Sequence, residues 1–190
     1  MKVEIESYTP RWHGDVIRLA SEVFGAGYFD RPSEIATQPG SLVLVCHEDD
    51  ERLVGFAQGQ LLSEGRLRDY LGPRVAEVPA EIAEADAQGA LGAIQAVAVL
   101  PGRRRRGIGC KLLATLHDAL VGLGADKLII TFRRGPSASP VDGLMARLDF
   151  EPWTRLPTYW QERCESGAFK CVDRRDRCAC EAVFYRKKVF

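Results

Sequence analysis

Hydrophobic and polar residues alternate at the start of the chain and then change to a helical period. Residues 2–8 (KVEIESY) alternate apolar with polar positions, which is typical of a half-buried strand. Thr9-Pro10 provides a helix cap and a first-turn proline, and apolar residues follow at helical spacing from Trp12 to Val23. The pattern predicts a strand followed by a helix, with a second short helix starting near Ser33.

Several strand-like segments follow. Residues 41–48 (SLVLVCHE) and 52–62 (RLVGFAQGQLL) flank Asp49-Asp50, which predicts a β-hairpin. Residues 91–100 (LGAIQAVAVL) are nearly all apolar, as in a central strand covered on both faces. Residues 127–132 (KLIITF) have the same character and predict a further buried strand.

The second half also contains two helical patterns. An apolar stripe from Ile108 to Leu123 marks one helix, and Ser139-Pro140 opens another that extends to about Leu148. Residues 158–163 and 181–187 then predict two strands, which pair as a hairpin around a cysteine- and arginine-rich segment.

Residues 63–90 interrupt this regular order. The segment is charged and alanine-rich, it contains Pro73, Pro79 and Gly89, and it shows no strong apolar face. Stretches of this length inside a compact domain are usually functional or mobile. Because the composition is not that of a linker, we predict an insertion within a single domain that spans residues 1–190.

Composition narrows the class of protein. The chain has 190 residues, 46% of them hydrophobic, and 26 basic residues balance 26 acidic ones. One globular domain is expected, and neither disorder nor a membrane span fits. Overall neutrality argues against nucleic-acid and membrane partners. The start of the chain does not have the pattern of a secretory signal, so we expect a cytoplasmic protein, either a monomer or a homodimer.

The segment VAVLPGRRRRGIGCKLL, residues 97–113, carries the clearest chemical signal. A buried strand leads through an arginine- and glycine-rich loop into a helix, whose exposed first-turn amides attract anions. Glycines let a phosphate approach the backbone, and arginines bind its oxygens. The pattern predicts a pyrophosphate site. The sequence Cys110-Lys111-Leu112 excludes a P-loop, and the mid-chain position excludes a dinucleotide fingerprint.

This strand, loop and helix resemble the signature of the GNAT superfamily of acetyl-CoA-dependent N-acetyltransferases, with Arg104, Gly107 and Gly109 in the matching places. The order of elements is similar from residue 3 to the end, and residues 148–150 (Leu-Asp-Phe) stand where relatives often have Leu-Gly-Phe. The alternative is that the arginine run is a solvated turn or a nuclear-import patch. That alternative does not explain the glycines and the helix that follow.

The resemblance implies an α/β fold: a mixed, mostly antiparallel central sheet, flanked by helices and splayed between the fourth and fifth strands. It also implies direct transfer of an acetyl group from acetyl-CoA to an amine of a small molecule or peptide. Acidic residues at 64–86 could attract a cationic amine, or could simply form a solvated surface. The cosubstrate-binding residues implied are Val97, Ala98, Val99, Arg104, Arg105, Arg106, Gly107, Ile108, Gly109 and Cys110.

The proton-transfer groups common in that family are missing. Ala93 stands near the place of a glutamate, with Gln95 beyond it, and Met145 stands at the place of a tyrosine. The catalytic residues are therefore unassigned, and the remaining candidates are Glu77, Glu81, Glu84, Tyr28, Tyr70 and Tyr159. The alternative function is a non-catalytic CoA-binding sensor or interaction module.

Four of the six cysteines cluster near the C-terminus. Cys164, Cys171, Cys178 and Cys180 frame the predicted hairpin, and four thiolates suit a structural zinc ion. Separate thiols and a redox pair are the other possibilities. A zinc ion would stabilise the hairpin beside the acceptor site. Alternatively, the chain would be a zinc-dependent interaction protein that binds its partner through this hairpin.

Overall fold

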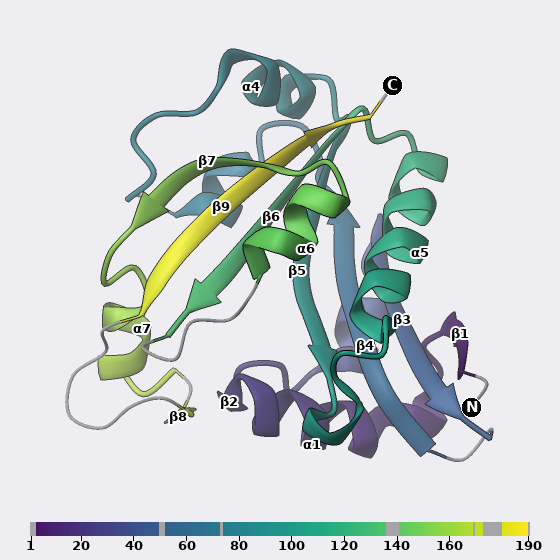
Figure 1. Ribbon diagram of the computed structural model, residues 1–190. Helices are drawn as coiled ribbons and strands as arrows, with labels where there is room; N and C mark the ends of the chain where they lie inside the picture. The colour runs from purple at the N-terminus through teal and green to yellow at the C-terminus, as the bar shows by residue number, and fades with distance from the viewer. Residues whose placement is uncertain are drawn as a thin grey trace.

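A seven-stranded sheet organises the chain (Figure 1). The computed structural model describes residues 3–49, 52–72, 74–135, 141–168, 170–172 and 180–189. The strands in spatial order are β1 (Val3–Ser7), β3 (Ser41–Glu48), β4 (Arg52–Leu61), β5 (Leu91–Val99), β6 (Lys127–Arg134), β9 (Glu181–Lys188) and β7 (Glu151–Leu156). Neighbouring strands are antiparallel except β5 and β6, which are parallel. The predicted α/β fold with a mixed, mostly antiparallel sheet is confirmed.

Helices cover both faces of the sheet. On one face lie α5 (Ile108–Gly122) and α6 (Val141–Arg147), and on the other lie α1 (His13–Val23) and α2 (Pro32–Ala36). The short helices α3 (Leu67–Leu71), α4 (Ala80–Ala87) and α7 (Gln161–Glu165) share a third apolar cluster with β5, β6 and β9. A small second sheet pairs β2 (Gly25–Ala26) with β8 (Lys170–Cys171). Within the described ranges, no helix has the length and apolar character needed to cross a bilayer.

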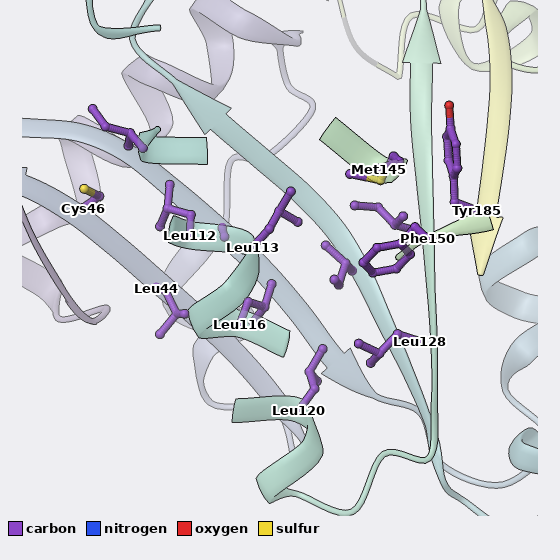
Figure 2. Packing of buried hydrophobic residues seen from close by; sticks show 14 of the residues in the cluster. Leu44, Cys46, Leu112, Leu113, Leu116, Leu120, Leu128, Met145, Phe150 and Tyr185 are labelled. Atoms are coloured by element: carbon purple, nitrogen blue, oxygen red, sulfur yellow. The ribbon is translucent and has the colours of Figure 1, made fainter. Parts of the chain in front are cut away.

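The leucines of α5 fix its position on the sheet (Figure 2). Leu112, Leu116 and Leu120 recur every four residues, and all three are fully buried. A Cβ at Gly59 in β4 would lie only 3.2 Å from side-chain carbons of Leu116 and Leu120. The glycine therefore lets the helix approach the sheet closely. This packing holds the first turn of α5 just beyond the end of β5.

The segment at 63–90 contributes more to the core than its sequence suggests. Leu67, Leu71 and Ile82 are buried in the cluster that α3 and α4 share with the sheet. The carboxylate of Asp86 in α4 accepts a hydrogen bond of 3.0 Å from the backbone amide of Leu67 in α3. The helix α4 begins directly after Pro79, and the apolar face of this segment is not evident in the sequence because two short helices share it.

The predicted strand at 158–163 is wrong, and so is its pairing with 181–187. The strand before this region is β7, residues 151–156, and β9 pairs with β6 and β7 instead. Thr158 has a left-handed backbone (φ 54°), which ends the extended segment. Trp160 and Cys164 are both buried four residues apart, a helical spacing that places Cys164 in α7.

Candidate functional site

The connection from β5 to α5 forms an open turn. A 3-10 turn, η2 (Pro101–Arg103), follows β5, and then Arg105 (φ 65°) and Gly107 (φ 79°) both adopt left-handed backbone conformations. Gly107 caps α5, whose first-turn amides lack partners within the helix and lie at the positive end of its dipole. A Cβ at Gly109 would meet only Val99, at 3.7 Å, so the space beside this turn is open to a ligand.

Arg103 anchors the turn to the hairpin. Its Nε donates hydrogen bonds of 2.8 and 3.1 Å to the two carboxylate oxygens of Glu48, and its Nη2 donates a third of 3.0 Å. These bonds from Arg103 lower the pKa of the Glu48 carboxyl below its ordinary value. Arg104 bonds back to the strand, since its Nε donates to the carbonyl oxygen of Val99 at 3.1 Å.

Strands β5 and β6 separate beside this turn. They pair only from Leu91–Lys127 to Ile94–Ile130, after which β5 stays with β4 and β6 stays with β9. The register of β4 against β5 shifts at the same place, and Gln95 is the extra residue of this bulge. The expected splay between the fourth and fifth strands of the predicted order is thus present.

Tyr70 of α3 bridges the two strands where they part. Its hydroxyl donates to the carbonyl oxygen of Ile94 at 3.1 Å and lies 3.3 Å from the hydroxyl oxygen of Thr131 on β6. A residue of the 63–90 segment therefore links β5 and β6 at the point where they separate, a contact that sequence spacing alone could not reveal.

A cavity of about 770 Å³ runs from the turn to the splay. All the residues predicted to bind the cosubstrate line it, except Ala98 and Arg106. Ala98 faces the α1 side of the sheet, in the apolar cluster of that helix. Arg133 and Arg147 also line the cavity, beyond the residues predicted from the sequence. Strand alternation from Thr131 could have indicated Arg133.

A second, smaller cavity of about 330 Å³ also borders the splay. Aromatic side chains dominate its lining, namely Tyr28, Phe29, Tyr70, Tyr159 and Trp160. Four residues line both cavities: Tyr28, Gln95, Ala96 and Thr131. The two cavities therefore meet at the bulge of β5, so a ligand in one would lie close to a ligand in the other.

Three tyrosines named as proton-transfer candidates lie together at the second cavity. Burial raises the pKa values of Tyr28, Tyr70 and Tyr159, so their phenols are protonated at neutral pH. Such groups can donate a proton or a hydrogen bond but are poor bases. Of the three, Tyr28 reaches both cavities.

The glutamate candidates lie elsewhere. Glu81 and Glu84 line a separate cavity of about 650 Å³, where Glu81 pairs with Arg186. Glu77 is exposed and lines none of these three cavities. Asp69 is the acidic residue that lines the second cavity, and its carboxylate pairs with Arg66 at 2.8 Å.

The structure leaves the predicted zinc site untested. Cys164 and Cys180 are buried in the same apolar cluster, Cys178 lies outside the described residues, and only the backbone of Cys171 is described. Among the residues that the structure describes, no three His, Cys, Asp or Glu side chains are grouped so that they could hold a metal ion. A zinc ion on all four cysteines remains a prediction.

Comparison with known proteins identifies a family that matches most of the chain. A sequence profile described as the acetyltransferase (GNAT) family matches residues 6–138, which include the turn, α5 and the splay. No curated protein matches the chain by sequence.

Several solved structures share the fold. The ribosomal-protein-S18-alanine N-acetyltransferase of Escherichia coli aligns with a TM-score of 0.65 at 15% identity, covering 99% of this chain and 94% of that one. A phosphinothricin acetyltransferase of Sinorhizobium meliloti, solved with AcCoA, aligns with a TM-score of 0.68 at 14% identity, covering 100% and 89%. NAA60 of Arabidopsis thaliana, solved with acetyl-CoA, aligns with a TM-score of 0.69 at 13% identity, covering 99% of each chain.

Proposed function

Because the chain belongs to the acetyltransferase (GNAT) family, we propose that it transfers an acetyl group from acetyl-CoA to a primary amine by direct attack of the amine on the thioester. The observation that carries this proposal is the meeting of two cavities at the splay of β5 and β6. A donor in one cavity and an acceptor in the other would have access to the same short stretch of backbone.

The larger cavity fits the cosubstrate. The first-turn amides of α5 and the side chains of Arg104 and Arg105 offer donors to a pyrophosphate, and Gly109 leaves room for it. Val97 and Val99 line the path toward the splay. The AcCoA complex of the Sinorhizobium meliloti protein, which has the same fold, supports this assignment. When bound, acetyl-CoA supplies an activated acyl carbon.

The residues shared by the two cavities fit the chemistry of transfer. Direct attack needs a neutral amine near the thioester, water to take the proton that the nitrogen loses as the amide forms, and a proton donor for the departing sulfur. The bulge at Gln95 frees backbone groups from the strand ladder, and such groups can stabilise a developing oxyanion. We assign Tyr28 as the proton donor, since this residue lines both cavities and its phenol is protonated at neutral pH.

An amine panel tests the proposal. The purified chain is incubated with acetyl-CoA and with small amines, amino acids and short peptides, and thiol release is followed. We expect release that depends on one class of amine, with the acetylated amine identified by mass spectrometry. Tight binding of acetyl-CoA without transfer to any amine would contradict the proposal and favour the non-catalytic sensor.

A further inference from the structure

The lining of the second cavity includes a positive charge at Arg163. Arg163 of α7 lines this cavity, with its guanidinium 5.8 Å from the centre of the Trp160 ring. Within the described ranges of the chain, no carboxylate forms an ion pair with Arg163. A stacked guanidinium keeps its donors available for an anion.

Among the residues that the structure describes, the charged groups near Arg163 have other partners. Arg74 donates hydrogen bonds of 2.7 and 3.0 Å to the carbonyl oxygens of Thr158 and Pro157, which are uncharged. The carboxylate of Asp69 is already paired with Arg66. Burial raises the pKa of Tyr159, and the positive charges of Arg163 and Arg74 oppose that rise, as expected for a cationic rim.

The size and walls of the cavity restrict what can bind there. At about 330 Å³ it is at the small end of the range for ligand pockets, roughly 300–1,000 Å³. Rings of Tyr28, Tyr159 and Trp160 line it and favour a flat or aliphatic body over a long polar chain. A long cationic polyamine would meet Arg163 at the mouth, where like charges repel.

We propose that the acceptor is a small primary amine that also carries a carboxylate, such as an amino acid, with Arg163 binding the carboxylate and the aromatic walls packing its side chain. This inference rests on the proposed transferase function. It replaces the idea that acidic residues at 64–86 attract a cationic amine, because only Asp69 of that group lines the cavity.

Matched pairs of amines test the inference. Each pair differs by one carboxylate: phenylalanine and phenethylamine, tryptophan and tryptamine, 4-(aminomethyl)benzoate and benzylamine. Binding to the CoA-saturated protein is measured by calorimetry, and kcat and KM by thiol release. Arg163→Gln removes the charge and Arg163→Lys retains it, while Arg18→Gln, on the exposed face of α1, is the control.

We expect at least one carboxylated member to bind about tenfold more tightly than its partner, the size of one charge-assisted contact. Arg163→Gln should abolish that preference through KM, Arg163→Lys should restore part of it, and Arg18→Gln should retain it. Equal or tighter binding of every decarboxylated partner would overturn the inference, and so would an equal loss for both members in Arg163→Gln. If no amine is acetylated, the transferase proposal fails, and the binding measurements still decide the role of Arg163.

Discussion

Arg103 has a structural role that its place in the run of four arginines does not reveal. The run predicts phosphate binding for the loop as a whole, yet Arg103 is bonded to Glu48, which lies 55 positions earlier in the chain. Contacts at that separation leave no local pattern in a sequence. By contrast, Gly107 and Gly109 were identified from sequence, because an open turn before a helix requires residues of this kind at short, fixed spacing.

Replacing Glu48 with Gln should make folding less dependent on pH. Because the pKa of Glu48 is lowered in the folded protein, its contribution to stability is present above the ordinary glutamate pKa of about 4.3. That contribution is lost as the pH falls through the lower folded value. Urea unfolding should therefore show a less stable Glu48→Gln variant at pH 7, and the gap should close toward pH 3. A difference in the free energy of unfolding that stays constant over this range would contradict the role of the charge. The control is Glu34→Gln, since Glu34 forms an exposed ion pair with Arg31.

Replacing Tyr70 with Phe should slow transfer without weakening the binding of acetyl-CoA. The change keeps the ring but removes the hydroxyl that contacts Ile94 and Thr131, so the splay loses one of its cross-strand contacts. We expect kcat to fall about tenfold, the effect of a misplaced reacting group worth roughly 1.4 kcal/mol. Steady-state kinetics and calorimetry on the same preparation check this, with Tyr8→Phe as the control. Unchanged kcat would show that Tyr70 only supports the fold.

Hydrophobic periodicity identified the long elements and several short ones, but it failed at residues 158–163. The helix α5 and the hairpin of β3 and β4 agree with the predicted positions, because each has several periods of apolar residues. Residues 158–163 were misread because Tyr159 and Trp160 favour strands locally, whereas Trp160 caps the five-residue helix α7 and is buried together with Cys164 of that helix. Burial in the tertiary structure decides whether such a short segment is a helix or a strand, and the local sequence carries no signal of that burial.

The contact between α3 and α4 predicts a specific loss of stability. Asp86→Ala would leave the buried amide of Leu67 without its acceptor, which costs about 1–3 kcal/mol. Denaturant unfolding should show that loss, and the exposed Asp30→Ala should leave stability nearly unchanged. Because α3 carries Tyr70, we also expect weaker transfer in Asp86→Ala. Wild-type stability in this variant would mean that the segment at 63–90 is held by its apolar contacts alone.

At the scale of the whole molecule, the resemblance to the GNAT superfamily predicted the arrangement of the sheet, which hydrophobic periodicity alone could not. The order of strands in the sheet, with β9 between β6 and β7, follows from no local signal. The first cavity combines residues as distant as Glu22, Gln95 and Arg147, and the second adds Arg163 beside the splay. The sequence predicts the part of the lining that the β5–α5 connection and the end of β5 supply, but not the part that α1, β6 and α6 supply.

The predicted zinc ion can be tested on the intact protein. If Cys164, Cys171, Cys178 and Cys180 bind it, metal analysis should find about one zinc per chain, and each Cys→Ser variant should lose it. Removal by a chelator should lower the thermal midpoint while acetyl-CoA still binds. Cys46→Ser, a buried cysteine outside the cluster, should keep the metal. If the folded protein is purified without zinc and does not take it up, the zinc prediction is wrong and the four cysteines are ordinary thiols.

Titration of the protein with acetyl-CoA tests the central claim most directly. Gly109→Trp would place an indole in the open side of the turn, and its backbone conformation is an ordinary one that a larger residue can adopt. Gly102→Trp lies in the same connection and outside the cavity lining, so it serves as the matched control. We expect the parent and Gly102→Trp to bind, and Gly109→Trp to lose binding while keeping its thermal midpoint. No binding by the folded parent, or equal binding by all three, would show that the cosubstrate does not occupy this turn.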